Sequence, residues 1–211
     1  MKNIRKNHEP RSLTQHRCQT HADYLNFKGK QDLRDSLVSE QGGICAYCMQ
    51  RIQSTAVGMK IEHWQCRDNY SSKQLDYGNL LGVCLGGKGQ KKIGQHCDTS
   101  KENKDLCRNP ANPTHDVEAV IRYLGDGRIK ADDEIFNHEI NEVLNLNHPL
   151  LVSNRKAVLK SFQESLGRVG SFGVASIQRK ISQWSQPDGG DLEPFCMVVV
   201  YWLRKKLAKV K

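Results

Sequence analysis

The first half of the chain carries one helical pattern, two strand-like patterns and then a second helix signal. A helix is predicted over residues 31–41, because three apolar side chains share one face and two glycines follow. Residues 59–64 and 79–84 are typical of short strands, and the polar residues 65–78 form a loop between them. Capping residues then predict a helix over residues 96–109, ended by a proline.

The second half is predicted to be mostly helical. Apolar residues recur at offsets of three, four and seven after Thr114, which predicts a helix before a turn at residues 124–127. Further helices are predicted over residues 133–146, 150–166, 173–185 and 194–208. The polar, basic residues 1–30 are expected to extend over the surface. These patterns divide the chain into an N-terminal region, residues 1–112, and a helical region, residues 113–211, which is expected to pack on it.

The composition is that of a polar globular protein. Hydrophobic residues make up 37% of the 211 residues and charged residues 26%, with a mean hydropathy of −0.65. The longest apolar run, Phe195–Leu203, is far shorter than a bilayer span. No apolar stretch follows the basic residues 1–6, so no secretory signal is expected and the expected compartment is the cytoplasm.

Positive charge is concentrated in the first half. The formal net charge is +9. Residues 1–110 hold 18 Lys and Arg against 11 Asp and Glu, whereas residues 111–211 hold 14 against 12. A basic half suits binding to a polyanion such as nucleic acid, although ordinary solubility charge gives the same imbalance.

Four of the eight cysteines have the spacing of a zinc site. Cys45 and Cys48 form a C-x-x-C turn, and Cys84 and Cys97 follow on later elements. A tetrahedral Zn²⁺ needs four such ligands, and a closed four-sulfur site is structural rather than catalytic. A redox pair is the alternative for C-x-x-C, but no thioredoxin-like βαβ pattern surrounds it. His96 is an alternative fourth ligand.

The remaining cysteines are expected to be small buried residues. They are Cys18, Cys66, Cys107 and Cys196. Because Cys18 lies between His16 and His21, a second metal site at that point stays open as an alternative.

Within the zinc spacing lies an ordered set of polar residues. Glu62 and His63 end the first predicted strand, Asn79 opens the second, and Asp98 and Lys101 follow the last cysteine. This order resembles the HNH endonucleases of the type in which a four-cysteine zinc site holds the ββα-metal core. Asp98 stands where many members have a second histidine. The resemblance implies an α+β fold, with a zinc-stapled HNH core and a mostly α-helical C-terminal half.

The chemistry of these residue types fits phosphodiester hydrolysis. A neutral histidine such as His63 is the natural general base for activating water. A carboxylate such as Asp98 suits Mg²⁺ or Mn²⁺, which supplies positive charge to the phosphate, and Glu62 is a second candidate ligand. The resemblance implies that Asn79 orients the catalytic histidine through the loop backbone.

Lysines flank this set and are candidate phosphate contacts. They are Lys88, Lys91, Lys92 and Lys101. The glycine-rich residues 86–89 lack the order of a P-loop, so the chain itself is not expected to hydrolyse ATP.

A wider resemblance covers most of the chain. Glu9-Pro10-Arg11, the segment 40–48, the Leu-Asn-Leu-Asn stretch at 144–147 and Asn154-Arg155 look like the HNH component (PtuB type) of Septu and retron-associated anti-phage systems. That resemblance implies an effector nuclease acting with an ABC/SMC-like ATPase (PtuA type). The alternatives are a non-catalytic zinc module that binds nucleic acid or protein, and a homing nuclease of a transposon or intron. Whether the nucleic acid is DNA or RNA stays open.

Overall fold

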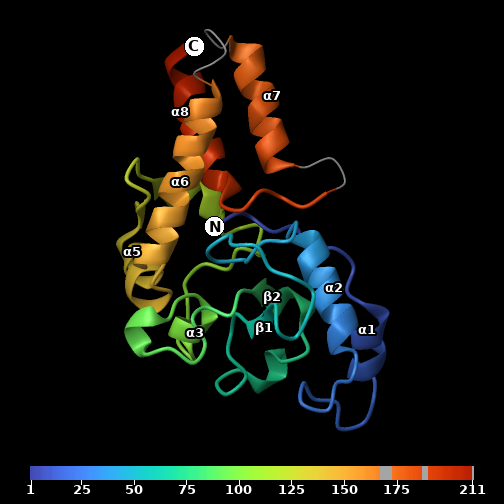
Figure 1. Cartoon of the computed structure of the whole chain (residues 1–211). Helices are drawn as coiled ribbons and strands as arrows, with labels where there is room; N and C mark the ends of the chain where they lie inside the picture. Colours follow the sequence, from blue (N-terminus) through green and yellow to red (C-terminus); the bar gives the residue numbers. More distant parts are fainter. Residues whose placement is uncertain (167–172, 187–189, 211) are drawn as a thin grey trace.

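The computed structural model describes residues 1–166, 173–186 and 190–210 and has an α+β fold (Figure 1). The strands are β1 (Lys60–His63), β2 (Leu80–Val83), β3 (Ile121–Tyr123) and β4 (Ile129–Ala131). The first helical elements are α1 (Arg11–Arg17), α2 (Lys30–Glu40), the 3-10 turns η1 (Ser71–Lys73), η2 (Tyr77–Asn79) and η3 (Lys92–Gly94), and α3 (Asp98–Lys101). The later ones are α4 (Val117–Val120), α5 (Glu134–His138), the π-helical turn η4 (Glu139–Val143), α6 (Pro149–Leu166), α7 (Val174–Ser185) and α8 (Cys196–Val210).

The two strands predicted in the first half form an antiparallel pair. In this pair His63 lies opposite Leu80 and Ile61 opposite Gly82. Gly82 weakens the strand pattern, yet β2 is buried along its whole length. The strand is supported at Gly82 by the buried side chain of Gln41. The amide of Gln41 exchanges two hydrogen bonds of 2.7 Å with the backbone N–H and C=O of Gly82. The glutamine thereby satisfies the outer edge of β2 as a third strand would.

The N-terminal segment is not a simple surface extension, and that prediction is wrong. Leu13 of α1 and Phe27 are buried, and they pack with Leu33 and Leu37 of α2. These side chains form a hydrophobic cluster against the chain that leads into β2. The polar composition of residues 1–30 hid the few apolar residues that tie the segment down.

The predicted helix after Thr114 is replaced by one helical turn and a β-hairpin. Asp116 caps α4, accepting a hydrogen bond from the Ala119 N–H, and the chain then enters β3. β3 pairs with β4 across the predicted turn. Ile121 and Tyr123 are buried on alternate positions of this strand, and Ile121 is the residue that also fits the helical offsets.

Two other predicted helices are shorter or irregular. The helix expected over 96–109 is the single turn α3, which ends where Glu102 takes a φ of 55°. The helix expected over 133–146 starts as α5 and widens into the π-helical turn η4. By contrast, the helices expected over 150–166, 173–185 and 194–208 correspond to α6, α7 and α8, which confirms them.

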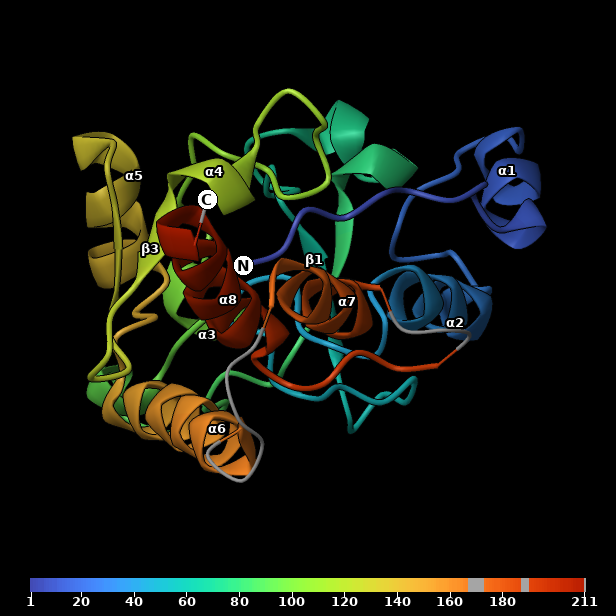
Figure 2. The ribbon, with the colours of Figure 1, turned by 90° about the horizontal axis from the view of Figure 1, so that it is seen from above.

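The last three helices stand together on one side of the strand pair (Figures 1 and 2). Phe162 of α6 and Ile177 of α7 are buried against Val199 and Leu203 of α8. The Phe162 and Trp184 rings meet edge to face at 5.3 Å between centroids. This apolar packing fastens α7 to its two neighbours.

The residues of the Leu-Asn-Leu-Asn stretch and Arg155 serve the fold. Arg155 is buried, and its guanidinium donates to the carbonyl oxygens of Gly127 and Leu146 at 2.6 and 2.7 Å. The Asn147 side chain exchanges two hydrogen bonds of 2.9 Å with the backbone of Ile129. These contacts bind α6 to the β3–β4 hairpin.

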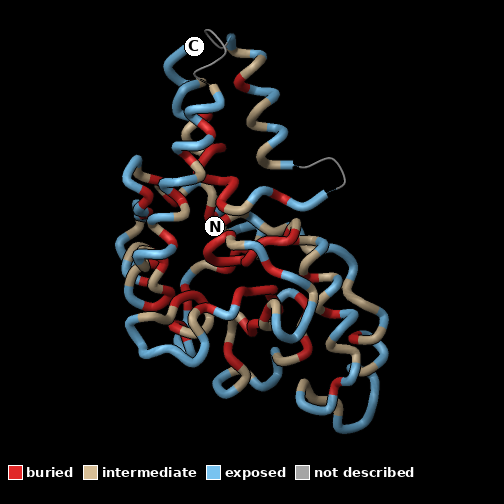
Figure 3. The backbone as a smooth tube through the Cα atoms, viewed as in Figure 1, coloured by how far each residue is buried: buried red, intermediate tan, exposed pale blue. Residues whose placement is uncertain are grey.

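The largest buried cluster draws on both halves of the chain (Figure 3). It joins Tyr47, Leu81 and Val83 to Ile140 and Val200. The helical region therefore packs directly on the strand pair and the cysteine loop. Within the described residues, no helix is long and apolar enough to cross a membrane.

Candidate functional site

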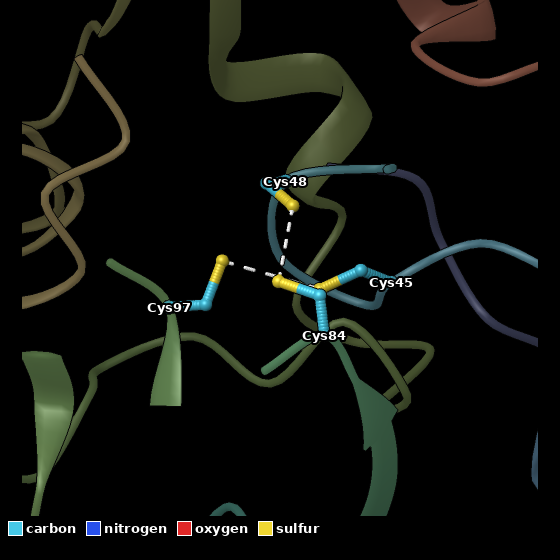
Figure 4. Close-up of side chains that lie close together, drawn as sticks. All are labelled: Cys45, Cys48, Cys84 and Cys97. Atoms are coloured by element: carbon cyan, nitrogen blue, oxygen red, sulfur yellow. Dashed lines mark hydrogen bonds between the residues drawn. The ribbon is translucent and has the colours of Figure 1, made fainter. Parts of the chain in front are cut away.

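Four cysteines from separate elements converge beside the strand pair (Figure 4). Cys45 and Cys48 lie on the loop after α2, Cys84 directly follows β2, and Cys97 precedes α3. All four are buried, and their sulfur atoms lie within 4.8 Å of one another. The sequence prediction that these four residues come together is confirmed.

The sulfur spacing matches a tetrahedral metal centre. The Cys45 and Cys97 sulfurs are 4.0 Å apart, and the Cys48 and Cys84 sulfurs 3.7 Å apart. Zn–S bonds of about 2.3 Å at tetrahedral angles place ligand sulfurs about 3.8 Å from each other. The cluster can therefore hold a zinc ion with little rearrangement.

Electrostatics in the cluster favour a bound cation. Burial raises the pKa of the Cys48 and Cys97 thiols well above the usual range, and hydrogen bonds with the Cys45 and Cys84 sulfurs raise both further. Burial acts the same way on Cys45, but hydrogen bonds from the three other cysteines outweigh it and lower the pKa of that thiol. Four thiolates need a cation to coexist in this buried space, which zinc provides.

The backbone of Cys97 adopts a strained conformation. Its φ of 56° lies in a region that residues with a side chain rarely adopt, at a cost of order 1–3 kcal/mol. The Cys97 N–H donates to the Leu144 carbonyl oxygen at 2.8 Å, which fixes the residue against the helical region. The conformation is therefore held from outside the cysteine loop.

His96 lies beside the cluster rather than among its converging ligands. Its Nδ1 is 3.2 Å from the Cys97 sulfur and 4.0 Å from the Cys84 sulfur. This geometry suits an N–H···S hydrogen bond from the imidazole to a zinc thiolate.

The other cysteines divide into two groups. Cys66 and Cys196 are buried as expected, whereas Cys18 and Cys107 are exposed, so the expectation is wrong for those two. His16 uses its Nε2 on the Asp23 carbonyl oxygen, 2.9 Å away. In the part of the chain that the structure describes, the residues around Cys18 do not form a converging group of metal ligands.

A second site opens next to the cluster, at the end of β1. A surface cavity of about 340 Å³ is lined by Glu62, His63 and Asp98. Residues of a regular strand alternate between faces, but β1 ends at His63, and both neighbouring side chains reach the cavity. The structure thus brings together the candidate base and both candidate carboxylates.

The two carboxyl groups are hydrogen-bonded to each other. Burial raises the pKa of Glu62 well above its usual range, and the hydrogen bond and the negative charge of Asp98 raise it further. Burial also acts upward on Asp98, but hydrogen bonds from Glu62 and Lys60 outweigh it and lower the pKa of that carboxyl. Of the two carboxyl groups, Asp98 is therefore the more readily ionised.

Three side chains surround this carboxyl pair. Lys60 Nζ lies 2.8 Å from Asp98, and Lys101 Nζ lies 2.9 Å from Glu62 Oε1. The Tyr47 hydroxyl donates to the same Glu62 oxygen at 3.1 Å. Because Tyr47 lies inside the C-x-x-C turn, this hydrogen bond links the cysteine loop to a residue that lines the cavity.

His63 is held by the loop between the strands. Its Nε2 lies 3.0 Å from the Gln74 carbonyl oxygen, and its ring meets Tyr24 edge to face at 4.5 Å. Burial lowers the pKa of His63 to about 4, against the hydrogen bond to Gln74, which acts to raise it. The imidazole is neutral at pH 7.

Asn79 lies away from the reacting groups and fastens the same loop. Its amide donates to the Gln65 and Lys73 carbonyl oxygens at 3.0 and 3.1 Å. Its Oδ1 accepts from the Gln65 N–H at 2.7 Å. Asn79 therefore fixes the segment that carries the Gln74 carbonyl.

The four candidate phosphate-binding lysines differ in their placement. Lys101 is fully buried and pairs with Glu62, so its ammonium is not exposed to a phosphate in this structure. Lys88 and Lys91 are exposed on the loop after Cys84. Lys92 is exposed as well and pairs with Glu102 at 2.8 Å.

Sequence reasoning missed Lys60, Tyr47, Gln74 and Arg67. Lys60 lies two residues before Glu62 on one face of β1, so strand alternation offered a signal for it. Gln74 acts through its backbone carbonyl, which leaves no trace in residue type. Arg67 lines the cavity from the polar loop.

Comparison with protein-family models gives no match to this chain, and comparison with curated proteins gives none either.

Proposed function

We propose that this chain is a metal-dependent HNH endonuclease that hydrolyses phosphodiester bonds of nucleic acid. One observation carries the proposal. The β1–β2 pair and α3 bring His63, Glu62 and Asp98 to one cavity, directly beside a four-cysteine cluster. A module that only bound nucleic acid or protein would have no use for a neutral histidine and a carboxyl pair in one cavity.

His63 acts as the general base. A carbonyl oxygen only accepts hydrogen bonds, so the bond to Gln74 keeps the proton on Nε2 and leaves the Nδ1 lone pair free to take a proton from water. Nδ1 has no hydrogen-bond partner among the described residues. Asn79 is a positioning residue, because it holds the loop that orients the imidazole.

Asp98 and Glu62 fit a hard divalent cation. Their carboxylate oxygens, which line one cavity, are the groups that would hold Mg²⁺ or Mn²⁺. When bound, the ion supplies positive charge for the scissile phosphate and the leaving oxygen. Lys101 then balances the ionised Glu62, and Lys60 and Arg67 line the cavity as further cations for the substrate phosphates.

The biological setting follows from the sequence resemblance. It supports an effector nuclease of an anti-phage system that acts in the cytoplasm with an ABC/SMC-like ATPase. In this proposal the helical region, residues 113–211, binds the ATPase. The cysteine cluster supports a structural zinc that holds the catalytic loop, since Tyr47 within it bonds to Glu62.

A cleavage assay on the full chain tests the proposal. Plasmid DNA, single-stranded DNA and RNA are each incubated with the purified protein and Mg²⁺ or Mn²⁺, alone and with the ATPase. His63→Ala should reduce cleavage by about 10²–10⁴-fold. His8→Ala is the matched control, because His8 is exposed and outside the cavity. Equal cleavage by the His63→Ala protein, with its zinc intact, would overturn the catalytic role.

A further inference from the structure

The chain between two cysteines of the cluster forms a tightly built loop. Residues 85–95 leave the cluster at Cys84 and return to it at Cys97, and the His96 N–H closes the loop on the Gly86 carbonyl oxygen at 3.0 Å. In Figure 1 this green segment lies at the edge of the molecule near α3.

Two glycines dictate the loop's shape. Gly86 and Gly87 have φ values of 56° and 72°. A Cβ at Gly86 would lie 2.1 Å from the His96 carbonyl oxygen, and one at Gly87 would lie 2.3 Å from the Gly94 carbonyl oxygen. Only glycine allows so close an approach, so the loop holds a set conformation rather than a variable one.

The loop presents a branched aliphatic side chain to solvent. Ile93, in η3, is 85% exposed, more than any other large hydrophobic residue that the structure describes. Lys88 and Lys91 are exposed on the same loop and form no ion pair within the described chain. Val57 is similarly exposed, at 81%, but residues 52–59 around it contain no Lys or Arg. Flanking lysines are therefore not a general feature of the exposed hydrophobic residues that the structure describes.

The loop stands next to the cavity. Lys92 Nζ lies 2.8 Å from Glu102 and 3.0 Å from the Ser100 carbonyl oxygen. Thr99 and Glu102 line the cavity that contains His63. Through Lys92, the loop therefore contacts the segment that forms one side of the cavity.

We propose that Ile93 is a wedge that enters a base step of duplex nucleic acid, while Lys88 and Lys91 contact the flanking phosphates. Apolar side chains flanked by cations kink duplexes in this way, and a kink exposes the backbone to a shallow site. The inference rests on the proposed nuclease function and adds the element that engages the substrate. The cysteine cluster anchors both ends of the loop, because the loop starts after Cys84 and ends before Cys97.

Fluorescence of 2-aminopurine tests the wedge in the full chain. The His63→Ala background prevents cleavage, and short DNA duplexes each carry one 2-aminopurine, with matching RNA duplexes as a second arm. Binding should raise the fluorescence at one base step, because the fluorophore brightens when it is unstacked. Ile93→Asp should abolish the rise and weaken binding about tenfold. Val57→Asp, the matched control, should change neither.

The lysines have their own readout. Lys88→Ala with Lys91→Ala should weaken binding and reduce the slope of log affinity against log salt by about two. A saturated duplex with no fluorescence rise, or an unchanged signal and affinity for Ile93→Asp, overturns the wedge.

The nuclease proposal fails separately. If the otherwise unsubstituted chain cuts nucleic acid and Ile93→Asp cuts and binds equally well, the wedge is wrong and the nuclease stands. If that chain cuts nothing yet shows a fluorescence rise that depends on Ile93, the wedge stands and the catalytic assignment falls.

Discussion

His63 and Gln74 are joined by a hydrogen bond of 3.0 Å between the imidazole Nε2 and the backbone carbonyl oxygen. The bond selects one tautomer, and burial keeps that imidazole neutral. Both effects depend on the loop between β1 and β2 staying in place.

Stability should depend on pH through His63. Its pKa is about 4 in the folded chain against 6.5 for the ordinary group, so below pH 6.5 the unfolded chain binds a proton that the folded chain does not. His63 therefore leaves the free energy of unfolding unchanged above pH 6.5 and lowers it as the pH falls from 6.5 toward 4. Between pH 7 and pH 5 the unsubstituted chain should lose about 2 kcal/mol more than His63→Gln, measured by urea unfolding. His8→Gln should behave like the unsubstituted chain, and parallel losses in all three would contradict the prediction.

Asn79→Ala should act on His63 from a distance. Without the bonds to Gln65 and Lys73 the loop loosens, so the imidazole gains water and loses its fixed orientation. Cleavage should fall by roughly tenfold to a hundredfold, because misplacement of a catalytic group is costly. The distinguishing measurement is the pH dependence of stability, which should weaken as the His63 pKa returns toward 6.5. A variant with slower cleavage and an unchanged pH profile would show that Asn79 positions something else.

The sequence predicted the cysteine cluster and the cavity residues better than the helices. Four thiols at this spacing have few structural roles besides a shared ion, and Glu62, His63 and Asp98 are ordered around them. The β3–β4 hairpin was missed because strands of three residues give too short an alternation to be distinguished from a helix, and Ile121 also fits the helical offsets.

The environment of the cavity was beyond sequence reasoning for a different reason. Lysine is normally exposed, so nothing local indicates that Lys101 is buried; its partner Glu62 arrives from another element. Gln74 contributes only a carbonyl oxygen, which every residue has. The nuclease activity, the divalent ion and the ATPase partner stay predictions.

One zinc ion per chain is expected from metal analysis. Cys84→Ser with Cys97→Ser should remove it, because two of the four ligands are lost. Cys66→Ser is the control, since Cys66 is buried but lies outside the cluster. Chelation should also unfold the region around β1, β2 and α3, detected as loss of amide-exchange protection. Zinc retained by the double variant would contradict the ligand set.

Lys101→Met should destabilise the chain by about 3 kcal/mol in urea unfolding, because it removes the buried cationic partner of Glu62. Adding Glu62→Gln should recover part of the loss, since the neutral amide no longer needs a cation. Lys91→Met, at an exposed position, should stay within about 0.5 kcal/mol. A Lys101→Met chain as stable as Lys91→Met would place the ammonium at the surface after all.

Asp98 and Lys60 should shift the divalent-ion requirement in opposite directions. Asp98→Asn removes a carboxylate ligand, so the Mn²⁺ concentration for half-maximal cleavage should rise by at least about tenfold, with activity recovering at high Mn²⁺. Lys60 Nζ lies 2.8 Å from the same carboxylate and competes with any cation bound there, so Lys60→Met should lower the Mn²⁺ requirement. Lys91→Met should leave it unchanged. Because loss of a phosphate contact would raise KM without altering this requirement, the Mn²⁺ titration separates competition at Asp98 from a role of Lys60 in substrate binding. A shift in the same direction for both variants would mean that Asp98 does not hold the ion.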